Sequence, residues 1–272
     1  MPVTLQFTAD VLEPDLYNDV QGLPDPFGIA VMIGISNTYT AGLYFRMRLV
    51  SPPADYTVYQ VNLGLLNAGN SSIYSPIFTR NIPTLAAGEC DETVTMRLEA
   101  FSDAGYSIPY GSKDLSVAIH HFDHLDPSWT VLEHADFNGN MNGWNLYSAQ
   151  GGYDTTYFYS SPSSIRVTYT GSSNYGPGYL KKTISVGSYS KARLVFHHHG
   201  RSGSDYQNND DFELSIAGVL KKPRPLPLPY NQWNRICYNM PTNQASEIYF
   251  WIGGHLYHYP MYYVDEIWVI AK

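Results

Sequence analysis

The chain has 272 residues, of which 44% are hydrophobic and only 15% are charged. Its net charge of −8, with only 16 lysines and arginines, makes nucleic acid and anionic membranes poor partners, and nothing approaches the roughly 18 apolar residues of a membrane span. Much of the polar surface must come from Ser, Thr, Asn, Gly and the 24 Tyr, which suits contact with glycans or protein surfaces.

The first half reads as a series of strands separated by turn residues. The best patterns are Leu43–Val50 and Glu92–Phe101, where apolar residues at every second position share one face. The other strands expected in this half are Ile29–Ser36, Tyr56–Leu65, Ile73–Asn81 and Leu115–Phe122. About seven strands in about 120 residues predict a Greek-key β-sandwich.

The pattern is interrupted at Phe122–Trp129, a short polar segment with a proline, and then restarts. We therefore expect two domains, residues 1–125 and 126–272, and an all-β fold. Asp123, His124 and Asp126 are linker polar groups or, alternatively, metal ligands. The strands expected in the second half are Trp129–Phe137, Ser164–Tyr169, Gly178–Ser185, Ala192–His199, Asp211–Ala217, Arg235–Met240, Glu247–Gly253 and Tyr262–Ile270.

The N-terminal residues and the composition give different indications of where the protein is located. Met1–Phe7 alternates like a strand and has neither a basic nor an apolar leader region, so the sequence as given shows no signal peptide. The composition is nevertheless typical of extracellular sandwiches. We expect an extracellular location with a removed signal, or the surface of a virion. Cys90 and Cys237 fall in different domains and are expected to be reduced or buried thiols, the alternative being an interdomain disulfide.

The second half carries an ordered set of short motifs. It opens with Ala-Asp-Phe-Asn-Gly at 135–139, continues with Ser-Pro-Ser-Ser-Ile-Arg-Val at 161–167, and closes with Tyr-Val-Asp-Glu-Ile at 263–267. In this order they resemble the jelly-roll carbohydrate-binding modules and the related MAM-like adhesion domains. The first half, through Ile-Pro-Thr-Leu-Ala-Ala-Gly-Glu at 82–89, looks like the Ig-like domains of the CARDB type.

The jelly-roll resemblance implies a structural calcium ion. Its ligands would be Asn138 and Asp265, with Asp136 adjacent, although Asn138 stands where the family usually has Glu and so removes a charge. The alternative is that Asp265 only hydrogen-bonds a loop.

Aromatic residues are the stronger functional signal, because sugars pack their C–H faces on aromatic rings. The candidate ligand-binding residues are Tyr175, Tyr179, Trp251, Tyr257, His258 and Tyr259. The alternatives are that Trp251 anchors the core and that the tyrosines bury against a neighbouring subunit.

The histidine pairs are the candidates for metal binding or catalysis in this sequence. His197 and His199 share a strand face and could chelate zinc if Asp210 or Asp211 approached, but core or surface packing is the simpler interpretation. His120-His121 also alternates in direction and has no evident chelating partner. No nucleophile elbow or phosphate loop is present.

We therefore expect a non-enzymatic adhesion protein that contacts glycans through the second domain. The alternative is a structural subunit of a virion or extracellular filament, with homo-oligomer contacts.

Overall fold

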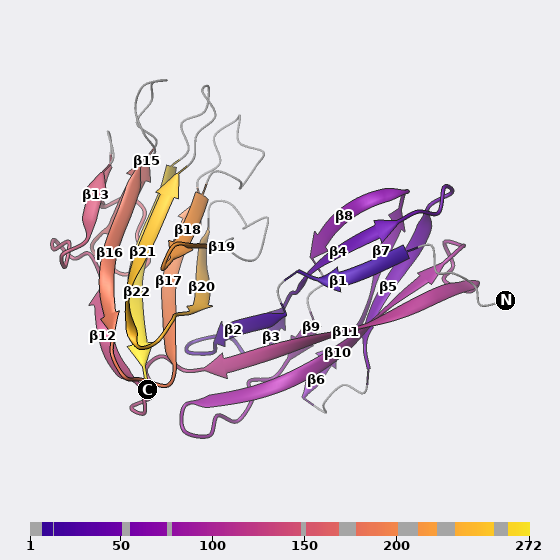
Figure 1. The fold of residues 1–272 in the computed structure, drawn as a ribbon, viewed down its shortest axis with the longest axis horizontal. Coiled ribbons are helices and arrows are strands. Elements are labelled where there is room, and N and C mark those ends of the chain that lie inside the picture. The colour runs from indigo at the N-terminus through magenta and orange to yellow at the C-terminus, as the bar shows by residue number, and fades with distance from the viewer. Residues whose placement is uncertain are drawn as a thin grey trace. The chain divides into compact units, whose positions relative to one another are not determined.

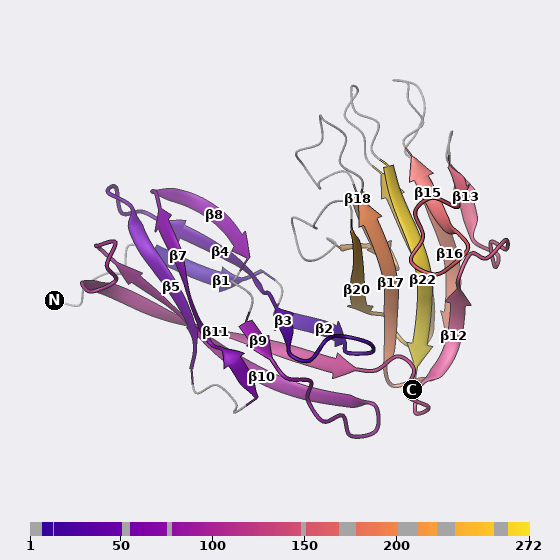
Figure 2. The same ribbon diagram turned by 180° about the vertical axis from the view of Figure 1, so that it is seen from behind.

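The computed structural model describes residues 7–12, 14–50, 55–74, 78–147, 151–168, 178–200, 212–221, 232–252 and 261–272. The chain divides into two compact units, Met1–Asp123 and His124–Lys272. Every named element is a β-strand (Figures 1 and 2), so the prediction of an all-β protein is confirmed. Within the described ranges, no helix has the length and apolarity needed to cross a membrane.

The described residues of the first unit contain eleven strands, more than the seven or so expected. They are β1 (Phe7–Val11), β2 (Asp15–Asp19), β3 (Phe27–Ile29), β4 (Met32–Asn37), β5 (Leu43–Leu49), β6 (Tyr56–Val58), β7 (Gln60–Leu66), β8 (Gly69–Tyr74), β9 (Phe78–Arg80), β10 (Glu89–Phe101) and β11 (Pro109–Phe122). The expected strand Ile29–Ser36 is two strands, β3 and β4, and Tyr56–Leu65 is likewise divided into β6 and β7.

These strands form a sandwich around one core. A five-stranded sheet has the order β2-β11-β10-β5-β7, and two three-stranded sheets have the orders β1-β4-β8 and β3-β9-β6. Leu43, Phe45, Met47 and Leu49 of β5 are all buried, as the alternation predicted. Strands β10 and β11 are a long antiparallel pair, and β2 pairs with β11 in parallel. The Ig-like assignment of this unit stays a prediction.

The second unit is an antiparallel sandwich of two sheets, as expected for a jelly roll. Its strands are β12 (Thr130–Ala135), β13 (Asn145–Tyr147), β14 (Gly152–Asp154), β15 (Ser164–Thr168), β16 (Tyr179–Val186), β17 (Ala192–Gly200), β18 (Phe212–Ile216), β19 (Val219–Lys221), β20 (Trp233–Asn239), β21 (Gln244–Ile252) and β22 (Met261–Ala271). One sheet has the order β14-β15-β22-β17-β20, with β12 also paired to β22; the other has the order β13-β16-β21-β18-β19.

The core of the second unit lies between these two sheets. Side chains such as Leu180 of β16, Phe250 of β21 and Phe196 of β17 are completely buried in it. Since side chains alternate along a strand, the neighbours of Leu180 and Phe250 project from the opposite face of the five-stranded sheet.

Candidate functional site

Tyr179 and Trp251, two of the predicted ligand-binding residues, are direct neighbours across the strands β16 and β21. Tyr179 comes one position before the buried core residue Leu180, and Trp251 comes one position after the buried core residue Phe250. The period-two alternation of strands therefore places both rings on the outer face of the five-stranded sheet. Neither ring is fully buried. Trp251 is thus not a core anchor, which was the alternative for this residue.

Two further tyrosines extend this pair into a continuous surface. Tyr147 of β13 lies opposite Tyr179 and stacks on it with 5.4 Å between ring centroids. Tyr249 lies 5.2 Å from Tyr179 and 6.3 Å from Trp251, again between ring centroids. We call these four residues, Tyr147, Tyr179, Tyr249 and Trp251, the aromatic face. It spans three adjacent strands of one sheet.

One ion pair accompanies the aromatic face. The Lys181 Nζ atom lies 5.4 Å from the centroid of Tyr179 and 5.7 Å from that of Tyr249, within the range of a cation–π contact. It also lies 3.3 Å from Oε2 of Glu247. Burial, and next the neighbouring Tyr179, raises the pKa of the Tyr249 phenol, which is therefore neutral at physiological pH. The four rings with Lys181 and Glu247 thus carry no net charge.

The aromatic face agrees only in part with the predicted residue set. Tyr179 and Trp251 belong to it, whereas Tyr175, Tyr257, His258 and Tyr259 lie outside the described residues. Tyr249 and Tyr147 were missed. The spacing of Tyr249 two positions before Trp251 could have identified it as sharing that residue's strand face. No comparable signal marked Tyr147, which joins the face only through the pairing of the three-residue strand β13 with β16.

The proposed calcium ligands make hydrogen bonds within two separate groups. The backbone N–H and side-chain amide of Asn138 donate to the Asp136 carboxylate, at 3.2 and 3.0 Å. The fully buried Asp265 accepts bonds of 2.9 Å from the backbone N–H groups of Tyr159, Ser160 and Glu266. Asp265 therefore holds a loop, as the alternative interpretation had it. A calcium site at Asp136, Asn138 and Asp265 stays a prediction.

The environment of Asp265 makes the stability of the second unit depend on pH. Burial raises the pKa of Asp265 to about 6, although the N–H bonds from Ser160, Tyr159 and Glu266 act in the opposite direction. An unfolded aspartate has a pKa of about 3.9. Between about pH 4 and 6 the folded protein retains a proton that the unfolded chain has released, so this group's contribution to the unfolding free energy falls as pH rises.

We expect Asp265→Asn to remove this contribution. The unfolding free energy of the wild type minus that of the variant, measured by urea titration at several pH values, should fall between about pH 4 and 6. Asp126→Asn is the control, because the backbone N–H of Ser128 lowers the pKa of Asp126. Its difference from the wild type should rise with pH only below about pH 4 and stay constant between about pH 4 and 6. A constant difference between wild type and Asp265→Asn would contradict the prediction.

The three consecutive histidines are all buried and alternate in direction as predicted. His198 pairs with the core residue Val264, and burial, followed by the charge of His199, lowers its pKa to about 3. His197 stacks under Tyr159 at 3.6 Å between centroids, and its Nε2 accepts a hydrogen bond from Arg235 Nε. Asp210 and Asp211 lie outside the described residues. The packing interpretation accounts for these contacts.

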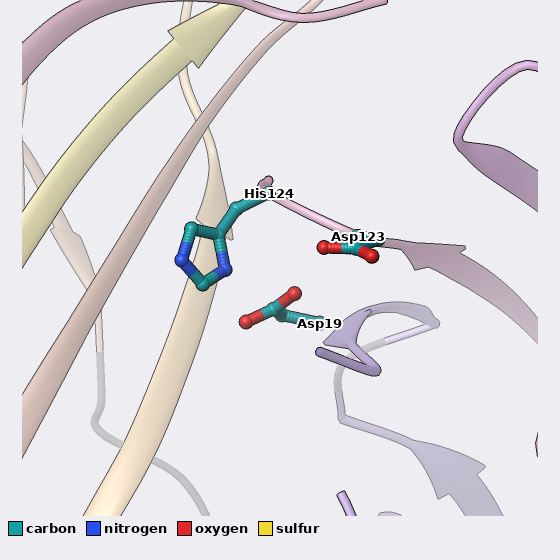
Figure 3. Close-up of side chains that lie close together, drawn as sticks. All are labelled: Asp19, Asp123 and His124. Atoms are coloured by element: carbon teal, nitrogen blue, oxygen red, sulfur yellow. The ribbon is translucent and has the colours of Figure 1, made fainter. Parts of the chain in front are cut away.

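Asp19 and Asp123 form a carboxylate pair at one end of the first unit. Asp19 ends β2 and Asp123 directly follows β11, and these two strands are paired in parallel. Oxygens of the two side chains lie within 4.8 Å of one another. Figure 3 shows this pair together with His124, the next residue of the chain. The backbone N–H of Gln21 donates to Asp19 at 3.3 Å, which gives this carboxylate a role in the turn after β2. The metal interpretation of Asp123, His124 and Asp126 stays a prediction.

No family model and no curated protein matches the chain. Among solved structures, it is similar to the CBM22-1 xylan-binding domain of Paenibacillus barcinonensis Xyn10C, with a TM-score of 0.38 and 12% identity, over 53% of this chain and 96% of that one. It is similar to a family 35 carbohydrate-binding module from Clostridium thermocellum, with a TM-score of 0.33 and 14% identity, over 53% and 98% of the two chains. The K3 cleaved adhesin domain of Lys-gingipain from Porphyromonas gingivalis gives a TM-score of 0.36 and 11% identity, over 53% and 99%.

Proposed function

We propose that the chain is a non-enzymatic binding protein that contacts glycans through the aromatic face of its second unit. The observation that carries the proposal is the set of four adjoining rings on the outer side of one sheet, Tyr147, Tyr179, Tyr249 and Trp251. Aromatic rings take the C–H surfaces of sugars, and a few fixed polar groups take their hydroxyls. The polar groups here are the tyrosine hydroxyls, Lys181 and Glu247.

The charge distribution favours a neutral glycan. Glu247 balances the charge of Lys181 at 3.3 Å, and the whole chain carries a net charge of −8. An anionic polysaccharide would gain little attraction from the aromatic face and would be repelled by the protein as a whole. An extracellular location and a role in adhesion belong to the same proposal, since a surface glycan is the partner that it requires.

Replacing Trp251 or Tyr179 with alanine should weaken glycan binding about 10- to 100-fold, because truncating a central aromatic contact typically costs about 1–3 kcal/mol. A glycan array on the purified full-length chain identifies the ligand, and titration calorimetry then compares the variants. Tyr59→Ala is the matched control, because Tyr59 is 53% exposed but belongs to the first unit.

Two results would count against glycan binding through the aromatic face. The first is equal loss of affinity in Tyr59→Ala and Trp251→Ala while both variants unfold like the wild type. The second is retention of no glycan on the array. If the chain also formed concentration-dependent oligomers that Trp251→Ala disrupted, the structural-subunit alternative would take its place.

A further inference from the structure

The sequence contains one tripeptide of the form Asn-x-Ser/Thr with x other than Pro, and it is Asn70-Ser71-Ser72. This is the acceptor motif for N-linked glycans, and it needs an accessible asparagine in a secreted chain. A three-residue motif alone is weak evidence that the asparagine is glycosylated. The evidence becomes stronger if the fold exposes that asparagine.

The fold places Asn70 on an edge strand with its side chain exposed. Strand β8 ends the sheet β1-β4-β8, and β4 is the only described strand that pairs with it. Asn70 lies opposite Ser36 of β4. Since Ile33 and Ile35 of β4 are buried, Ser36 faces away from the core, and Asn70 shares that outward face. Asn70 also comes directly after Gly69, the first residue of β8, whose φ of +130° is one that glycine adopts readily and other residues rarely do.

Strand β8 itself carries none of the residue types that usually keep an edge strand from pairing with other molecules. The sequence of the strand, Gly-Asn-Ser-Ser-Ile-Tyr, has no charged residue and no proline. Natural edge strands are commonly protected by lysine, proline or a covering segment, because their open N–H and C=O groups can pair with another chain. A bulky, hydrated group at Asn70 would block such pairing.

We infer that Asn70 is an N-glycosylation site and that its glycan covers the open edge of β8. The donor is a lipid-diphosphate-linked oligosaccharide. The Asn70 amide nitrogen forms a bond to the anomeric carbon as the carbon–oxygen bond to the diphosphate breaks. The lipid diphosphate leaves with the electron pair, and the displaced amide proton passes to a base. This site is independent of the aromatic face, which lies in the second unit.

The test uses two serines that differ by one position. The full-length chain is secreted from eukaryotic cells as wild type, Ser71→Ala and Ser72→Ala. Wild type and Ser71→Ala, which keeps the motif, should exceed the 30.6 kDa sequence mass by one oligosaccharide that peptide N-glycosidase removes. Ser72→Ala, which destroys the motif, should have the sequence mass. A wild-type chain without glycan at Asn70 would overturn the assignment.

A separate measurement tests whether the glycan on Asn70 covers the edge of β8. Light scattering after size-exclusion chromatography should show self-association of Ser72→Ala, with Ser71→Ala remaining monomeric at the same concentration. Removing the glycan from folded wild type should produce the same self-association. Equal monomer fractions in all of these samples would overturn the covering role.

Discussion

Replacing Arg80 with methionine should lower the free energy of unfolding of the first unit by about 3 kcal/mol. This is the lower end of the usual cost of removing one member of a buried ion pair, because Asp55 and Glu92 are 31% and 18% exposed. Arg80 ends β9 and is 3% exposed. Its guanidinium contacts the carboxylates of Asp55 and Glu92. Methionine keeps most of the volume, so the loss measures the charge and its hydrogen bonds more than a cavity.

The cost is large because Arg80 is the cation of a connected polar network. Its guanidinium lies 4.7 Å from the centroid of Tyr56, whose hydroxyl donates to Glu92 at 3.1 Å. His121, which is fully buried, lies 2.9 Å from the same Glu92 oxygen. Burial alone would raise the pKa of Glu92, but the hydrogen bond with His121 and the charge of Arg80 lower it overall. Without Arg80, two carboxylates would remain without their main counter-charge.

The measurement is urea unfolding of the full-length chain, with the transition of each unit followed separately. Arg97→Met is the matched control. Arg97 makes a two-bond ion pair with Asp114 at 2.6 and 2.7 Å, but the pair is 33% and 46% exposed. An exposed pair of this kind contributes about 0–1 kcal/mol. Equal losses from Arg80→Met and Arg97→Met would refute the role assigned to the network.

The strands that the sequence predicted well are those in which burial alternates along the chain. In β10, Val94, Met96, Leu98 and Ala100 were expected to share a face, and all four are buried. Strand β2 was missed because Asp15, Asn18 and Asp19 belong to residue types that are depleted in strands. It forms through parallel pairing with β11, about a hundred residues later in the chain, and no local pattern reports such a partner.

The same limit applies to the functional residues. Tyr179 and Trp251 could be selected one by one because aromatic residues are frequent around them. That they are neighbours depends on the register of β16 against β21, which is a property of the folded sheet. For a related reason, the sequence did not predict the polar network around Arg80. His121 had no evident partner in the sequence, because Arg80 and Glu92 reach it from different strands.

Gly178→Ala should both destabilise the second unit and weaken glycan binding. Gly178 directly precedes β16, whose first residue is Tyr179. A Cβ atom at Gly178 would lie 2.0 Å from the backbone oxygen of Thr168 and 3.0 Å from its carbonyl carbon. Both are backbone atoms, so no rotamer change relieves the clash, and one of the two segments must move. We expect the free energy of unfolding of the second unit to fall by about 3 kcal/mol, the upper end of the usual cost of overpacking.

Gly187→Ala is the control at the opposite end of the same strand, because a Cβ there meets nothing within 4 Å. Thermal unfolding and retention on the glycan identified for the wild type should separate the two variants. Gly187→Ala should behave as the wild type in both measurements. Gly178→Ala should unfold earlier and, at temperatures where it is still folded, bind less tightly, because the displaced end of β16 carries Tyr179 out of contact with Tyr147 and Tyr249. Loss of stability without loss of binding would mean that the Tyr179 ring is not required for recognition.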